Sequence, residues 1–194
     1  MKIADPETKR WTRDEFYRMV EDGYFDGQRA ELIGGEVLVM SPQNPPHFSE
    51  IKRIETQLQF VFDKGFWIRT QGPLSLGLDS DPEPDLAVVK GTFEDFSNSH
   101  PTSALLIVEV ADTTLDYDRG RKASLYASAG IADYWIVNLR DHQLEVCRKP
   151  VRERSQPFGF RYDQITILKS GRKITPLAKP KSVLSVGKLL PPER

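Results

Sequence analysis

The sequence predicts an α/β fold built on a mixed β-sheet, and three observations favour this class. The apolar run Leu105 to Val108 is typical of a strand that is covered on both faces. The pattern changes to that of a helix between about residues 116 and 129, and a strand rich in β-branched and aromatic residues follows over 131–139. Because a strand, a helix and a strand in succession form a crossover unit, we expect two parallel strands at the centre of the sheet.

Two short elements are predicted before residue 41. A capping box over Thr12 to Glu15 opens a helix that ends at Gly23. The spacing of its apolar residues predicts one buried face that holds Phe16, Met19 and Val20. Residues 31–40 are typical of a β-hairpin around Gly34-Gly35, because both glycines tolerate the positive φ of a tight turn.

The remaining elements follow from periodicity and turn residues. A helix is expected over 47–62, where apolar residues recur three or four positions apart, and the helix over 116–129 ends at Gly130. Further strands are expected over 66–71, 84–89, 104–111, 143–148 and 158–168. From residue 175 the chain is expected to be mostly extended, with one short helix near Leu189.

Length and composition exclude several classes of protein. The 194 residues carry 39% hydrophobic side chains and a formal net charge of -1, as one ordinary globular domain does. The single cysteine, Cys147, excludes an internal disulfide and a cysteine-ligated zinc site, and fits a reducing cytoplasmic location. We expect neither a signal peptide nor a membrane partner, because no apolar run is long enough.

Charge is distributed unevenly along the chain. Residues 1–139 hold 14 basic and 23 acidic side chains, whereas residues 140–194 hold 13 basic and 5 acidic ones. The densest basic stretch contains Arg148, Lys149, Arg152 and Arg154. Two interpretations stay open: a surface that contacts phosphates, or a solvated surface that balances an acidic body.

Two carboxylates stand out against the predicted strands. Glu109 interrupts the apolar central strand near its C-terminal end, and a buried carboxylate needs a cation, a metal ion or access to water. Asp85 begins the preceding strand, directly after Pro84. If the two strands are neighbours, both carboxylates converge, and hard oxygen ligands of this kind suit Mg²⁺ or Mn²⁺.

Lys122 is the third candidate. It lies one turn before Tyr126 on the crossover helix, so both side chains share a face that packs on the sheet. Its ammonium group would orient an attacking water or neutralise charge at a phosphorus centre. The alternative is a structural ion pair between Lys122 and Glu109.

Other polar residues have structural explanations as well. Glu31 could be the ion-pair partner of Arg29 or Arg53. His47 could be a helix cap or a surface residue, and Tyr126 could simply pack on the sheet.

Several short segments follow one another in an order that is more specific than any single motif. They are ELIGGE (31–36), SP (41–42), His47, PDLAVV (84–89), LIVEV (106–110), DRGRK (118–122) with Tyr126, and GIADYWIV (130–137). Over about residues 11–146 this series resembles the Uma-two family of restriction endonucleases, a branch of the PD-(D/E)XK nuclease superfamily.

The resemblance implies a restriction-endonuclease-like core, in which helices flank a mixed sheet with additional N-terminal and C-terminal strands. It implies a single nuclease-like domain over 1–194, with the core at about 11–146 and a basic extension at about 147–194. Asp85 and Glu109 would hold Mg²⁺ or Mn²⁺, helped by the main-chain carbonyl of Val110. Glu31, His47 and Tyr126 would be supporting residues.

The chain departs from the usual superfamily motif at one position. The catalytic lysine normally stands two residues after the glutamate, where this chain has Ala111. The family pattern makes Lys122, on the following helix, the matching residue.

The expected function is therefore that of a metal-dependent endonuclease that hydrolyses DNA phosphodiester bonds by water attack, without an organic cofactor. Contacts to DNA would come from the basic C-terminal third and from Lys52, Arg53, Arg119 and Arg121. A symmetric homodimer would let two sites address two strands. Two alternatives stay open: a non-enzymatic binding or scaffold module with a nuclease fold, and a hydrolase of RNA or small phosphoesters.

Overall fold

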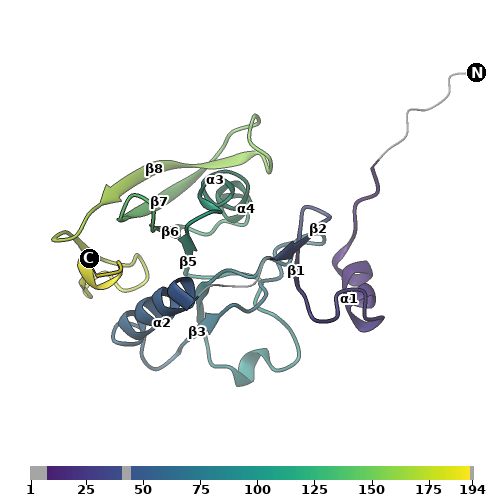
Figure 1. Ribbon diagram of the computed structural model, residues 1–194, viewed down its shortest axis with the longest axis horizontal. Helices are drawn as coiled ribbons and strands as arrows, with labels where there is room; N and C mark the ends of the chain where they lie inside the picture. Colours follow the sequence, from purple (N-terminus) through teal and green to yellow (C-terminus); the bar gives the residue numbers. More distant parts are fainter. Residues whose placement is uncertain (1–7, 41–44, 193–194) are drawn as a thin grey trace, which may run out of the picture.

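A six-stranded mixed sheet forms the centre of the computed structural model, which describes residues 8–40 and 45–192 (Figure 1). The strands are β3 (Phe66–Thr70), β4 (Leu86–Lys90), β5 (Leu106–Ala111), β6 (Asp133–Asn138), β7 (Gln143–Arg152) and β8 (Phe160–Leu168), in this spatial order. β5 and β6 pair in parallel, and the other neighbours are antiparallel. The predicted α/β class and the crossover unit are confirmed.

Helices cover the two faces of this sheet. The helix α2 (Pro45–Gln59) packs on one face, where its apolar side chains join Val108 and Trp135 in one core. The crossover connection packs on the other face and comprises α3 (Leu115–Tyr117), the π-helix η2 (Asp118–Lys122) and α4 (Ala123–Ser128). β5 is buried along its whole length, as the apolar run predicts.

The N-terminal elements are confirmed, but their packing is not. Helix α1 (Arg13–Glu21) begins with the predicted capping box, and Gly34-Gly35, both with positive φ, joins β1 (Arg29–Ile33) to β2 (Glu36–Met40). The predicted buried face of α1 is wrong, because only Phe16 of its three members is buried and Val20 is 42% exposed. Figure 1 shows the reason: α1 lies beside the hairpin at the periphery and not on the central sheet.

Several boundaries differ from those predicted. Asp85 precedes β4 and is not its first residue, and α2 spans 45–59 where 47–62 was expected. The C-terminal part adds a small unpredicted hairpin of β9 (Lys173–Ile174) and β10 (Leu184–Ser185), and then η3 (Val186–Lys188), close to the expected short helix. A further short helix, η1, spans Glu94–Phe96.

The SP pair at 41–42 lies outside the described residues. Within the described ranges every helix is too short or too polar to span a membrane.

Asp133 ties the C-terminal segment to the sheet. Its fully buried carboxylate accepts hydrogen bonds from Trp135 Nε1 at 2.7 Å, from Arg148 Nε at 2.8 Å and from the Leu177 amide at 2.8 Å. Arg148 also donates to the carbonyl of Thr175. Part of the basic C-terminal charge is therefore neutralised inside the fold.

We expect Asp133→Ala to lower the free energy of unfolding by about 3–5 kcal/mol, because it leaves the Arg148 guanidinium without its buried carboxylate partner. Urea denaturation followed by circular dichroism measures this. The matched control is Asp163→Ala, which removes an exposed ion pair with Arg161 and should change stability by no more than about 0.5 kcal/mol. Equal effects of the two substitutions would contradict the proposed role of Asp133.

Candidate functional site

A cavity of about 310 Å³ opens between the end of β2, the first turn of α2 and the corner from β5 into α3. Acidic side chains outnumber basic ones in its lining: Glu83, Asp85, Glu109, Asp112 and Asp118 against Arg29, His47 and Lys122. We call this cavity the acidic cleft. Its excess of negative charge suits a divalent cation.

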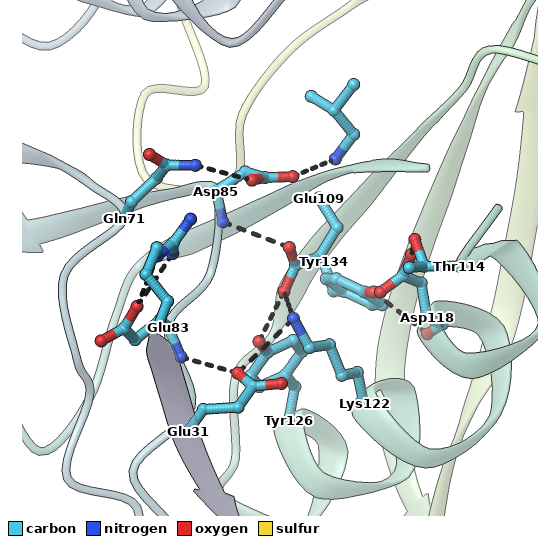
Figure 2. A network of polar contacts seen from close by, with 12 residues as sticks. Glu31, Gln71, Glu83, Asp85, Glu109, Thr114, Asp118, Lys122, Tyr126 and Tyr134 are labelled. Carbon is cyan, nitrogen blue, oxygen red and sulfur yellow. Dashed lines mark hydrogen bonds and ion pairs between the residues drawn. The ribbon is translucent and has the colours of Figure 1, made fainter. Parts of the chain in front are cut away.

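Asp85 and Glu109 meet in this cleft because their strands are neighbours. Leu86 pairs with Val108 in the antiparallel register, so the preceding residue Asp85 lies beside Glu109. The Asp85 amide donates to Glu109 Oε2 at 3.2 Å, and the Val110 amide donates to Asp85 Oδ2 at 2.8 Å (Figure 2). The structure thus brings together the two predicted carboxylates and Val110.

Lys122 and Tyr126, both on the crossover helix, contact the carboxylate of Glu109. Lys122 Nζ donates to Glu109 Oε1 at 2.9 Å, and the Tyr126 hydroxyl donates to the same oxygen at 2.7 Å. Both side chains are buried, and Figure 2 shows them converging on Glu109 from below the sheet. The predicted shared face of the two residues is confirmed.

Glu31 enters the site from the hairpin. Its Oε2 lies 3.8 Å from Lys122 Nζ and accepts a hydrogen bond from the Glu83 amide at 3.0 Å. Its ion-pair partner is therefore Lys122, and the alternative partners Arg29 and Arg53 pair instead with Glu83 and Glu50.

His47 lies against the carboxylate of Asp85. Its Nε2 is 3.2 Å from Asp85 Oδ2, and it belongs to the first turn of α2. The Gln71 side chain donates to Asp85 Oδ1 at 3.4 Å, a contact that the sequence did not indicate. The other four predicted residues, Lys122, Tyr126, Glu31 and His47, therefore gather around the two carboxylates Asp85 and Glu109.

Asp118 is a further acidic residue of the cleft that sequence reasoning missed. It is buried in the π-helix, and its Oδ2 accepts a hydrogen bond from the Thr114 hydroxyl at 2.7 Å. Its place in the DRGRK segment was the available signal, but the functional roles predicted there concern only the basic residues Arg119, Arg121 and Lys122.

Burial and neighbouring charges shift the ionisation of these groups in different directions. Burial raises the pKa of Glu109 to about 8, with the Lys122 ammonium acting against the shift, and burial raises the pKa of Asp118 to about 6. Burial is the largest influence on Asp85 and acts to raise its pKa, but the hydrogen bond and charge of His47, the Val110 amide and the Lys122 charge together outweigh it, so the pKa is lowered. Burial would lower the pKa of Lys122, but Glu109 and Glu31 hold it well above its ordinary value, so the ammonium stays charged.

The donor atoms fit a magnesium-type ion. Within the ranges 8–40 and 45–192, no three His, Cys, Asp or Glu side chains form a metal-binding group by themselves. Asp85, Glu109 and the Val110 carbonyl offer fewer ligands than such an ion takes, and all three residues line the cleft. Mg²⁺ commonly takes one or two carboxylates and completes its shell with water and substrate phosphate, so this donor set suits it.

The four cations predicted to contact DNA are all engaged in ion pairs. Arg119 binds Glu145 through two hydrogen bonds, and Arg121 pairs with Glu36 at 2.7 Å. On α2, Lys52 pairs with Glu55 and Arg53 with Glu50. Their contact with nucleic acid stays a prediction.

The fold and site together define a class. Two acidic residues at neighbouring strands of a mixed sheet, with a lysine on the same cleft, form the arrangement of restriction-endonuclease-like proteins. The sequence matches the Uma2 family, described as "Putative restriction endonuclease", over residues 13–178. The chain belongs to this family, and its membership supports a nuclease-type function.

A solved structure shares the fold. A crystal structure of a putative nuclease belonging to DUF820 from Anabaena variabilis superimposes with a TM-score of 0.69 at 13% sequence identity, covering 92% of this chain and 96% of the other. The comparison with curated protein sequences gave no significant match.

We expect Lys122→Met to lower the free energy of unfolding by about 3–5 kcal/mol, because it removes the buried cation that Glu109 and Glu31 share. Without this cation Glu109 must be buried either unpaired or protonated, and both cost free energy at neutral pH. The double variant Lys122→Met/Glu109→Gln should recover at least about 1 kcal/mol, since a neutral amide replaces that carboxyl group. Urea denaturation at pH 7.5 measures both. A double variant as unstable as the single one would mean that packing, and not charge, explains the loss.

Proposed function

We propose that this protein is a divalent-metal-dependent endonuclease that hydrolyses phosphodiester bonds of DNA by attack of water. One observation carries the proposal. Asp85 directly before β4, Glu109 in the neighbouring strand β5 and Lys122 in the crossover helix converge on one acidic cleft, with 2.9 Å between Lys122 Nζ and Glu109 Oε1. We further propose that the whole chain acts as one nuclease-like domain in the cytoplasm.

The residues of the cleft have separate tasks in this proposal. Asp85, Glu109 and the Val110 carbonyl would hold Mg²⁺ or Mn²⁺, which when bound supplies Lewis-acid polarisation of the phosphate and a more acidic water. Lys122 provides a fixed positive charge close to the metal ligands, where it would position water or stabilise the charge that develops on phosphate oxygens.

The supporting residues hold these groups in place. Tyr126 donates to the Glu109 oxygen that also binds Lys122, so the second oxygen, Oε2, is the one that the side chain can offer to an ion. His47 and Gln71 fix the carboxylate of Asp85 from two directions. Such outer contacts orient metal ligands, and their loss commonly lowers affinity or activity 10- to 100-fold.

The first test is a cleavage assay on supercoiled plasmid and on short DNA strands with Mn²⁺, Mg²⁺ or EDTA. We expect cleavage with metal only, and a loss of at least about 100-fold in Asp85→Asn and in Lys122→Met. The matched control is Asp116→Asn, which changes an exposed carboxylate of α3 outside the lining of the cleft and should cleave at the wild-type rate.

The outcome also separates the alternatives. Cleavage of an RNA strand or a small phosphodiester, but not of DNA, would mean that the protein is a hydrolase with the proposed chemistry and a different substrate. Binding of nucleic acid without cleavage under any of these conditions would favour the non-enzymatic binding module and contradict the proposed function.

A second prediction concerns the metal itself. Calorimetric titration with Mn²⁺ should show binding to the wild type, and binding at least about 10-fold weaker in Asp85→Asn. Asp116→Asn should bind like the wild type, and circular dichroism verifies that each variant is folded. Unchanged Mn²⁺ affinity in Asp85→Asn would exclude this residue as a ligand.

The homodimer remains a separate proposal. In a symmetric dimer the two acidic clefts would be related by a two-fold axis, so that each could address one strand of a duplex. Sedimentation of the purified protein decides this, and a monomer at all concentrations would refute it.

A further inference from the structure

A second cavity, of about 250 Å³, adjoins the acidic cleft. Its lining comes from α1, the turn that follows it, β1 and the segment before β4. The two cavities share Arg29 and Glu83, which form an ion pair with 2.8 Å between Arg29 Nη2 and Glu83 Oε2. We call the second cavity the aromatic pocket, and the Arg29 guanidinium lies on the wall between it and the cleft.

Three aromatic side chains contribute to the walls of this pocket, beside polar and small residues. Phe16, Tyr17 and Phe25 line it, with ring centroids 5.7 Å apart for Phe16 and Tyr17 and 5.8 Å apart for Phe16 and Phe25. Val20, on the same helix, lines it as well and is 42% exposed. Aromatic side chains next to a phosphodiesterase cleft are the usual partners of unstacked bases.

Asp81 adds a hydrogen-bond acceptor to this pocket. Its side chain is 1% exposed, and its Oδ2 accepts a hydrogen bond from the Tyr17 hydroxyl at 2.6 Å. Its Oδ1 has no hydrogen-bond partner among the residues that the structure describes. Buried carboxylate oxygens are normally satisfied, and the exocyclic amino group of a base such as cytosine is a donor that carboxylates accept.

Arg29 supplies the charge that a strand would need between the two cavities. Like Lys122 and His47 it is bound to a carboxylate, that of Glu83, but its side chain is 39% exposed, whereas Lys122 is 5% and His47 is 22% exposed. Arginine binds phosphate through a planar pair of N–H donors. A phosphate on Arg29 would link one nucleotide in the cleft with the next one in the aromatic pocket.

We propose that the aromatic pocket receives the unpaired base of a nucleotide next to the bond that is cut, while Arg29 binds the phosphate between them. This inference rests on the proposed function and specifies its substrate class: single-stranded or locally unpaired nucleic acid. A base cannot enter such a pocket while it is stacked and paired in a duplex, so an intact duplex binds less well.

The test fills the pocket and measures binding and cleavage of a labelled single strand and of the matching duplex. In Val20→Trp the larger side chain occupies the cavity, and we expect affinity for the single strand to fall about 10-fold, by the worth of one stacked base. Affinity for the duplex should change by less than about 2-fold, because no base of an intact duplex occupies the pocket. The matched control is Tyr24→Trp, which enlarges a 71% exposed side chain nearby that does not line the pocket.

A second variant tests the phosphate contact independently. Arg29→Met should weaken single-strand binding and reduce the slope of log affinity against log salt by about 0.7, the value for one phosphate contact. The double variant Arg29→Met/Glu83→Gln should show the same slope as Arg29→Met. This result would mean that the change comes from the lost phosphate contact and not from repulsion by the unpaired Glu83 carboxylate. Arg18→Met, an exposed arginine of α1 outside both cavities, should keep the wild-type slope.

The failure of this inference is distinguishable from the failure of the proposed function. The base-binding role of the aromatic pocket would be refuted if the wild type cuts single strand and duplex equally and Val20→Trp behaves like Tyr24→Trp. The proposed nuclease activity would still stand in that case. Wild-type protein that cuts nothing with Mn²⁺ would overturn the proposed function, and salt-dependent binding that is unaffected in Arg29→Met would overturn the assigned contact.

Discussion

The buried ion pair between Lys122 and Glu109 is the interaction on which the candidate site depends. Glu109 accepts hydrogen bonds from Lys122, from Tyr126 and from the Asp85 amide, so one carboxylate joins β5, the crossover helix and the segment before β4. Glu31 extends the same network to the hairpin. Buried charges are tolerated only when they are paired and hydrogen-bonded, so the packing of these elements and the geometry of the cleft depend on each other.

A π-helical segment brings Lys122 to the carboxylate of Glu109. Ala111 occupies the usual lysine position and is fully buried, so no charge reaches the cleft from there. Residues 118–122 form a π-helical segment, and both of its ends, Asp118 and Lys122, are buried towards the site. π-helical segments occur frequently at functional sites, because the extra residue in the turn changes the direction of the side chains that follow.

Electrostatics set a limit on how a strand can approach this protein. The cleft is acidic, and the cations that the sequence suggested for DNA contacts are bound to neighbouring carboxylates. In the basic C-terminal third, Arg148 and Lys179 are likewise paired, with Asp133 and Asp63. If the protein acts as proposed, a substrate phosphate would depend on a metal ion in the cleft and on local arginine contacts more than on these paired cations.

The sequence by itself determined the α/β class, the crossover unit and the hairpin, because hydrophobic periodicity and glycine turns are local signals. The isolated polar positions in the strands and the crossover helix indicated Asp85, Glu109 and Lys122, whereas Glu31, His47 and Tyr126 were indicated only by the resemblance to the family. It did not determine how α1 packs, that the crossover helix contains a π-helical segment, that Asp118 and Arg29 line the cleft, or that Gln71 donates a hydrogen bond to Asp85. Those features arise from contacts between segments far apart in the chain, such as Glu31 with Lys122 and Asp81 with Tyr17. Tertiary packing alone decides which charged side chains are buried away from water. A buried charge is stable only beside an opposite charge or hydrogen-bonding groups, so burial also decides which contacts these side chains make.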